Sequence, residues 1–233
     1  MILFDLKSLG TLTQGTLIKR ENRFLATAIV DGSIKKVHIA DTGRLEEILT
    51  PNRELLLLKN RPGLKTDYTL IAAKMEEGWV LINTKLHSPI AKKAIEAGVL
   101  GFIPRSIKSE VTFGKSRLDF KVDEAFVELK GCSLVIENTC LFPNAPTTRG
   151  VKHIEDLIEA KQQGFEAFLL VMAVRKCRCF APHPSRDPDF KAIFYQALKV
   201  GVQYRGFFAT ITPELEVILG GELPLCRGVA QPG

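Results

Sequence analysis

The chain has 233 residues, of which 45% are hydrophobic and 25% are charged, a composition typical of a globular protein with one large domain or two small ones. Its longest apolar run, at residues 167–174, is far too short to cross a membrane, so membrane association is not expected. The net charge of +6 favours anionic partners, with nucleic acid as the first candidate.

The N-terminal segment 1–10 has neither a basic region nor a long apolar stretch, so no signal peptide is expected and the protein is predicted to be cytoplasmic. Short strand-like runs with turn signals then fill the first 82 residues. Strands are expected at residues 10–19, 24–30, 35–40, 54–59, 68–74 and 79–82.

Asp31-Gly32 is a strong hairpin turn between the second and third of these runs. A short helical piece is expected at residues 44–49, before the fourth run. Three strands, a helix and further strands form the order of an OB-type barrel, and an SH3-like barrel is the competing small β fold. We therefore expect an OB-fold domain over residues 1–82.

The pattern changes near residue 83, where helical and strand-like segments begin to alternate. Helices are expected at 89–99, 148–163 and from Pro188 to about residue 200, and strands at 134–142, 167–180, 204–211 and 216–219. This order predicts an α/β domain over residues 83–226, with helices on both faces of a sheet. The last residues, 227–233, have no periodicity and are expected to form a disordered tail.

Residues 116–131, SRLDFKVDEAFVELKG, read as a hairpin with two acids on one face. If Asp123-Glu124 is a two-residue turn, Asp119 and Glu128 become direct cross-strand neighbours, and Lys130 points to the same side. Like charges so placed repel each other, and a divalent cation such as Mg²⁺ or Mn²⁺ would remove the repulsion. The alternative is a solvated hairpin face on which lysine and arginine side chains neutralise both acids.

The order of Asp119 and then Glu128-Leu129-Lys130 is similar to the D…ExK core of the PD-(D/E)XK nuclease superfamily. Longer segments resemble the sugar fermentation stimulation protein A (SfsA) family, in the same order and over nearly the whole chain. They are RENRFLATAIV (20–30), HIADTGRLEEIL (38–49), EVTFGKSRLDF (110–120), VELKG (127–131), FPNAPTTRGVKH (142–153) and DPDF (187–190).

This resemblance implies an N-terminal OB-fold domain, a C-terminal nuclease-like domain, DNA binding and a metal-dependent phosphodiesterase site. It makes Asp119 and Glu128 the metal ligands, Lys130 the catalytic lysine, and Glu110 an acid that completes the metal shell. Val174 departs from the family pattern, which has a glutamine there, and it cannot support the lysine as a polar side chain would.

Basic residues are the candidates for binding nucleic acid through phosphate contacts, without sequence readout. Three of these candidates, Arg149, Lys152 and His153, fall at the start of the helix capped by Thr147 or Thr148, beside the free N–H groups of its first turn. Phe24, next to the basic cluster at 19–23, is expected to belong to the core. The expected contacts are Lys19, Arg20, Arg23, Lys35, Lys36, Arg44, Arg117, Arg149, Lys152 and His153.

Three functions follow as hypotheses: a Mg²⁺- or Mn²⁺-dependent nuclease acting on DNA, a non-catalytic DNA binder or regulator of sugar metabolism genes, and a protein or sugar binder using the OB domain. The oligomeric state is left open, a homodimer included. The five cysteines have no CxxC spacing, so reduced structural thiols are expected rather than a zinc site.

Overall fold

The computed structural model describes residues 1–228, which divide into two compact units. Unit 1 comprises Met1–Ile90 and Ala209–Leu219, and unit 2 comprises Ala91–Phe208 and the described residues from Gly220 onward. The expected disorder of the tail concerns mainly residues 229–233, which lie outside the described residues.

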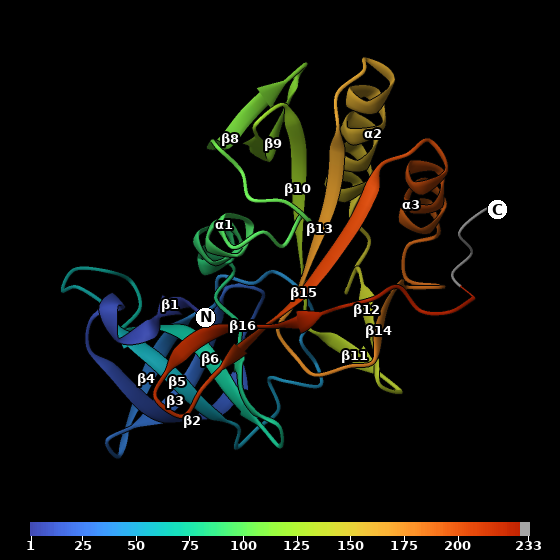
Figure 1. The fold of residues 1–233 in the computed structure, drawn as a ribbon. Helices are drawn as coiled ribbons and strands as arrows, with labels where there is room; N and C mark the ends of the chain where they lie inside the picture. The colour runs from blue at the N-terminus through green and yellow to red at the C-terminus, as the bar shows by residue number, and fades with distance from the viewer. Residues whose placement is uncertain (229–233) are drawn as a thin grey trace. The chain divides into compact units, whose positions relative to one another are not determined.

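Unit 1 contains a closed five-stranded barrel (Figure 1). β2 pairs antiparallel with β3 and β5, β3 with β4, and β5 with β6, while the parallel pairing of β4 with β6 closes the barrel. This is the strand order of an OB-type barrel, so the expected fold is confirmed. The barrel strands are β2 (Leu12–Arg20), β3 (Leu25–Val30), β4 (Ser33–His38), β5 (Glu54–Lys59) and β6 (Tyr68–Met75), and β7 (Gly78–Leu81) pairs with β6.

The hairpin between β3 and β4 turns at Asp31-Gly32, where both residues have positive φ as a type I′ turn requires. The expectation of a helical piece at residues 44–49 is wrong. The segment makes only a single turn, in which Leu49 N–H donates to Leu45 O at 2.8 Å. A segment of six residues closes too few hydrogen bonds to stabilise a helix.

Unit 1 also contains a short strand that the sequence pattern does not indicate. β1 (Ile2–Asp5) pairs antiparallel with part of β16 (Glu216–Glu222), placing Phe4 opposite Val217. A 3₁₀ helix, η1 (Leu6–Leu9), follows it. Four residues carry too little alternation to be distinguished from a loop by pattern alone.

Unit 2 is built on a twisted sheet in the order β15-β13-β10-β9-β8, with β8 at its edge. β10, β13 and β15 are parallel to one another, while β8 and β9 are antiparallel. The strands are β8 (Ile107–Phe113), β9 (Ser116–Val122), β10 (Ala125–Cys132), β13 (Ala167–Ala173) and β15 (Gln203–Ile211), the last three residues of β15 lying in unit 1.

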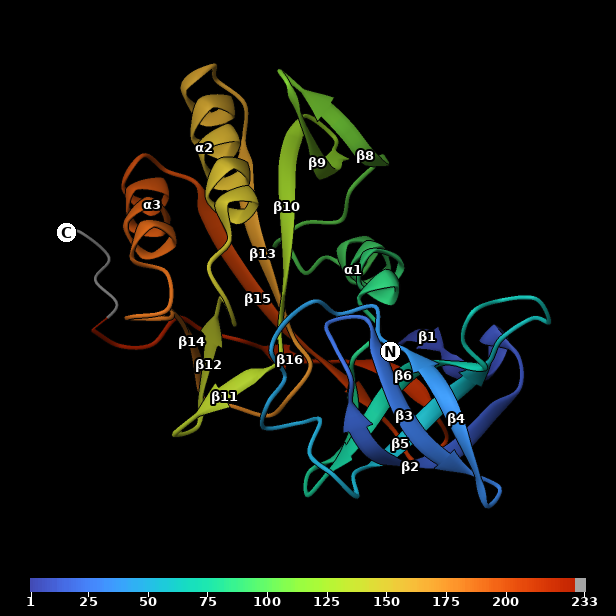
Figure 2. The same ribbon diagram turned by 180° about the vertical axis from the view of Figure 1, so that it is seen from behind.

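The helices α2 (Thr148–Gln162) and α3 (Pro188–Lys199) lie side by side on one face of this sheet (Figures 1 and 2). Their apolar side chains share one core with β10 and β13. The mixed α/β class is thus confirmed, although these two helices lie on the same face rather than on opposite faces. Two further helical elements, η2 (Thr84–Leu86) and α1 (His87–Glu96), precede the sheet.

A second, three-stranded sheet corrects two expected strands. It consists of β11 (Leu134–Ile136), β12 (Thr139–Phe142) and β14 (Cys179–Pro182). The strand expected at 134–142 is a hairpin, because Glu137 and Asn138 turn with positive φ. The strand expected at 167–180 is two strands in different sheets, since β13 ends at Ala173 and β14 begins six residues later.

The expectation of reduced thiols is also wrong for four of the five cysteines. Disulfides join Cys132 to Cys140 and Cys179 to Cys226, and Cys177 is free. These pairings depend on Cα atoms that the tertiary structure brings together, which sequence spacing does not reveal. Among the described residues, no helix is both long and apolar enough to cross a membrane.

Candidate functional site

The hairpin of β9 and β10 has the expected turn and register. Lys121 pairs with Phe126 and Phe120 with Val127 on either side of Asp123-Glu124. The ladder ends there, and Asp119 Oδ2 instead accepts a hydrogen bond from Leu129 N–H at 2.7 Å. Asp119 is therefore bonded to the backbone of β10 rather than paired directly with Glu128, which corrects the expected cross-strand pair.

The carboxylate of Glu128 is the centre of a buried cluster. Its Oε1 accepts hydrogen bonds from Lys130 Nζ, on the same strand, and from His153, on α2. Its Oε2 is buried and has no hydrogen-bond partner among the described residues. Burial acts to raise the pKa of Glu128, but Lys130 and His153 outweigh it and hold that pKa below the usual range. Glu128 is therefore an ionised acceptor with one oxygen still unsatisfied.

Asp119 lies beside this cluster and behaves in the opposite way. Burial, followed by the negative charge of Glu128, raises the pKa of Asp119 to about 6. The hydrogen bond from Leu129 and the charge of Lys130 lower that pKa but do not outweigh burial. A buried carboxylate whose pKa is raised further by a second carboxylate indicates a site where positive charge would be stabilised.

This raised pKa predicts a pH dependence of stability. Asp119 binds its proton more tightly in the folded protein than in the unfolded chain, so its contribution to the free energy of unfolding falls as the pH rises from about 4 to 6. The lost contribution is about 2 kcal/mol. Denaturant titrations of the metal-free wild type and of Asp119→Asn measure this effect. The free energy of unfolding of the variant should rise relative to that of the wild type as the pH increases from about 4 to 6. A difference that is equal at pH 4 and pH 7.5 would contradict the assignment.

Glu110 lies in β8, next to β9, but its side chain is not drawn into the cluster. The ladder between β8 and β9 pairs Ser109 with Phe120 and Val111 with Leu118, which leaves Glu110 opposite Asp119. Its φ of 54° departs from strand geometry, and its carboxylate, 71% exposed, pairs with Arg117 at 3.4 Å. Glu110 therefore lies in β8 with its carboxylate bonded to Arg117, and its expected place in a metal shell stays a prediction.

The N-terminal turn of α2 positions three of the expected basic residues. Thr147 is the N-cap, and its hydroxyl accepts a hydrogen bond from Gly150 N–H at 2.9 Å. Arg149 is exposed, and its Nε donates to His153 Nε2 at 3.4 Å. His153 is buried and points at Glu128, so its side chain faces the carboxylate cluster rather than solvent.

Asp156 is a further buried acid that the sequence reasoning missed. It is 5% exposed, and its Oδ1 pairs with Lys152 at 3.4 Å. Its Oδ2 is buried without a partner among the described residues. The sequence spacing could have indicated this residue, because Asp156 lies four residues after Lys152 and three after His153, on the same side of the helix.

The basic residues of the barrel differ in how free their side chains are. Lys19 pairs with Glu21 at 3.0 Å. Arg20 donates to the backbone carbonyls of Gly43, Arg44 and Arg23, so it holds the loop before β5 together. The other barrel candidates show no side-chain ion pair among the described residues. They are Arg23, Lys35, Lys36 and Arg44.

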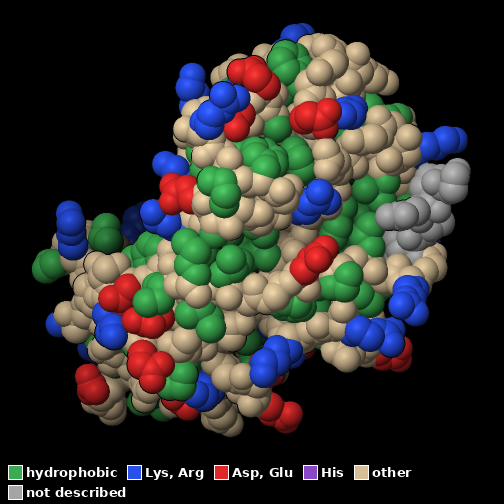
Figure 3. Space-filling model, viewed as in Figure 1, with side chains coloured by type: hydrophobic (Ala, Val, Ile, Leu, Met, Phe, Trp, Pro, Cys, Tyr) green, Lys and Arg blue, Asp and Glu red, His purple; other side chains and the backbone are tan. Residues whose placement is uncertain are grey.

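Phe24 corrects another expectation, because it is 53% exposed rather than part of the core. It begins the segment that leads into β3, directly after Arg23. On the face shown in Figure 3, lysine and arginine side chains are interspersed with acidic ones rather than gathered into one patch. An exposed aromatic ring beside scattered basic side chains suits stacking on a base better than sequence-specific readout.

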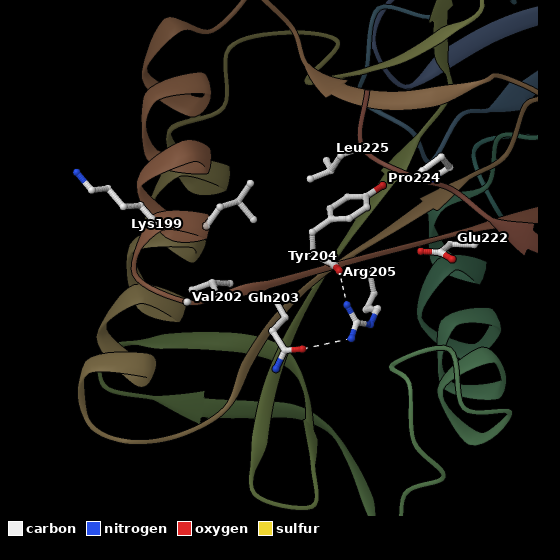
Figure 4. Close-up of a pocket in the computed structure, with 10 residues that line it drawn as sticks. Lys199, Val202, Gln203, Tyr204, Arg205, Glu222, Pro224 and Leu225 are labelled. Atoms are coloured by element: carbon white, nitrogen blue, oxygen red, sulfur yellow. Dashed lines mark hydrogen bonds between the residues drawn. The ribbon is translucent and has the colours of Figure 1, made fainter. Parts of the chain in front are cut away.

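A pocket of about 830 Å³ lies elsewhere in unit 2, between α3 and β15 (Figure 4). Tyr204 lies within it and donates its hydroxyl hydrogen bond to Leu223 O at 3.0 Å. Arg205 donates to Tyr204 O at 3.0 Å and to Gln203 Oε1 at 3.3 Å. None of the residues lining this pocket belongs to the carboxylate cluster, so the pocket and the candidate metal site are at different places in unit 2.

The carboxylate cluster contains a small set of oxygen donors that could hold a divalent cation. Within residues 1–228, no three histidine, cysteine, aspartate or glutamate side chains converge as metal ligands. Mg²⁺ is commonly held by only one or two carboxylates, with water and substrate phosphate completing the shell. Asp119 and the free Oε2 of Glu128 match that donor set.

Comparisons with known proteins agree along the chain. Residues 18–82 match the family model described as the SfsA N-terminal OB domain, and residues 85–215 match that described as the sugar fermentation stimulation protein RE domain. The chain is 42% identical to a sugar fermentation stimulation protein homolog of Methanococcoides burtonii, over 91% of this chain and 92% of that one. It is 37% identical to the homolog of Saccharolobus solfataricus, over 93% and 86%.

A solved structure shares both the fold and the length of the chain. It is described as the structure of Pyrococcus furiosus SfsA in complex with Ca²⁺. The two are 27% identical, with a TM-score of 0.86 over 97% of this chain and 99% of that one.

Proposed function

Because the chain belongs to the sugar fermentation stimulation protein (SfsA) family, we propose that it binds DNA and cleaves it at a divalent-metal site formed by Asp119 and Glu128. One observation carries the proposal: Glu128 Oε2 is buried and ionised without a hydrogen-bond partner among the described residues. An Mg²⁺ or Mn²⁺ ion would satisfy that oxygen and offset the repulsion felt by Asp119. The related Pyrococcus furiosus protein was solved in complex with Ca²⁺, which supports cation binding in this family.

When bound, such an ion would lower the pKa of water and neutralise negative charge on a phosphate. The chain's own residues do the rest. Lys130 keeps Glu128 ionised through its ion pair, and its ammonium adds positive charge next to the position of a scissile phosphate. Arg149 is exposed at the start of α2, where a guanidinium and the free N–H groups of the first turn both favour an anion.

The barrel is proposed to hold the nucleic acid without reading its sequence. Arg23, Lys36 and Arg44 carry no ion pair among the described residues, so they are available to phosphates. Phe24, which is exposed, adds a surface for base stacking. Arg20 is left out of this set, because its guanidinium already bonds to the backbone of the loop at 41–44.

Cleavage assays test the proposal. Purified protein is incubated with single- and double-stranded DNA and RNA, with Mg²⁺, with Mn²⁺ and with EDTA. Asp119→Asn removes a negative ligand while keeping the acceptor for Leu129, and cleavage is expected to fall about 100-fold or more. The matched control is Glu124→Gln, in the same hairpin and 84% exposed, which should cleave like the wild type.

Two outcomes would overturn the proposal of nuclease activity. Cleavage that survives Asp119→Asn unchanged would come from a contaminant. Binding that weakens steeply with salt, with no cleavage of any substrate, would favour the alternative of a non-catalytic, sequence-independent DNA binder or regulator. The engagement of Lys130 by Glu128 is compatible with that alternative, because the ammonium is already bonded to a carboxylate in the metal-free protein.

A further inference from the structure

Two contacts from different elements hold the same oxygen of Glu128. Lys130 approaches Oε1 along β10, and His153 approaches it from α2. Glu128 is 2% exposed and His153 8% exposed, so solvent contributes little to either contact. With Oε1 held on two sides, the carboxylate cannot rotate freely, and Oε2 is the oxygen left without a partner among the described residues.

The proton on His153 can be assigned from its two neighbours. Arg149 Nε carries a hydrogen and can only donate, so His153 Nε2, at 3.4 Å, must accept. The proton of a neutral imidazole then lies on Nδ1, from which it is donated to Glu128 Oε1. An imidazole with its proton on Nε2 would turn a hydrogen toward Arg149 and a lone pair toward the carboxylate.

We infer that Arg149 and His153 form a positioning pair, in which Arg149 contacts the His153 ring from its Nε2 side and His153 orients Glu128 so that Oε2 is presented to a divalent cation. The inference rests on the metal site of the proposed function and assigns His153 a role other than contacting phosphate. Hydrogen-bond partners that orient a metal-ligating carboxylate commonly set the affinity for the metal.

The start of α2 sets the geometry of this pair. The Thr147 cap fixes where the helix begins, through its bond to Gly150 N–H. Residues 149 and 153 are then one turn apart on the same face, which is the separation at which side chains meet. The helix packs that face toward β10, as the contact between His153 and Glu128 shows.

Nitrogen-15 NMR of the metal-free protein tests the tautomer directly. The His153 ring of the wild type should give the pattern of a proton on Nδ1, and the same pattern is expected in Arg149→Met, because the ionised carboxylate of Glu128 can only accept. A wild-type ring with its proton on Nε2 overturns the inference.

Calorimetric titration with Mn²⁺ alone tests the positioning role. His153→Ala is expected to weaken Mn²⁺ binding about 10- to 100-fold. His153→Asn, whose amide can still donate to Glu128, should stay within about threefold of the wild type. The matched control is His38→Ala, in the barrel strand β4, which should bind as the wild type does.

The outcomes separate this inference from the proposed nuclease. If His153→Ala binds Mn²⁺ as tightly as the wild type, the positioning role fails even when DNA is cleaved. If the variants behave as expected but no nucleic acid is cut, the nuclease fails and the positioning role stands. Should His153→Ala not fold, a loss of affinity in His153→Asn equal to the loss of Mn²⁺ binding in Asp119→Asn would overturn the inference.

Discussion

Glu128→Gln is expected to lower the free energy of unfolding at pH 7 by about 3–5 kcal/mol, the usual cost of removing one partner of a buried ion pair. The substitution keeps the volume of the side chain but leaves Lys130, only 9% exposed, without its counter-charge. It should also abolish Mn²⁺ binding, because the ligand at Oε2 loses its negative charge. Denaturant unfolding and calorimetry measure the two effects on the same samples.

The same hairpin offers a matched control for the charge effect. Glu124 pairs with Lys121 at 3.0 Å but is 84% exposed, so Glu124→Gln should cost less than about 1 kcal/mol. The double variant Glu128→Gln, Lys130→Met removes both buried charges and should recover part of the lost stability. Equal costs for the two single substitutions would contradict the buried character of the Glu128 cluster.

Cys226→Ser is expected to lower the free energy of unfolding by about 4 kcal/mol, because it opens the disulfide to Cys179. The two cysteines are 47 residues apart, and closing a loop of that length restricts the unfolded chain by about this amount. Denaturant unfolding without reductant measures the loss. Cys177→Ser, which removes the free thiol, is the matched control and should change stability little.

Counting thiols checks the disulfides independently. All five cysteines lie within the described residues, and four of them are paired. Denatured wild-type protein should therefore expose one reactive thiol without reductant and five after reduction. Five reactive thiols before reduction would contradict both bridges and restore the expectation drawn from the sequence.

Local patterns were enough to predict most of the secondary structure and the register between β9 and β10. The Asp31-Gly32 turn and the runs around it predicted the OB-type order, since alternation and turn chemistry act over a few residues. The pairing across Asp123-Glu124 was correct for the same reason. The capping position of Thr147 follows from the hydroxyl and the helical period after it.

Long-range contacts explain where the sequence-based reasoning was wrong. It placed Asp119 directly against Glu128, yet Asp119 bonds to Leu129 N–H where the ladder ends. It assigned His153 to phosphate, yet α2 packs so that this ring meets a carboxylate 25 residues away in the chain. Alternation along a strand says which face a residue occupies but not which helix covers that face.

The identity of the chemical groups in the candidate site was therefore readable from residues 119–130 and the segment at 142–153. Which oxygen of Glu128 is held, which is left free and how Cys179 pairs with Cys226 depend on segments that are distant in the chain. Those contacts form only when α2 and the three-stranded sheet pack in place. Burial acts to raise the pKa of both acids; it prevails at Asp119, whereas Lys130 and His153 outweigh it at Glu128.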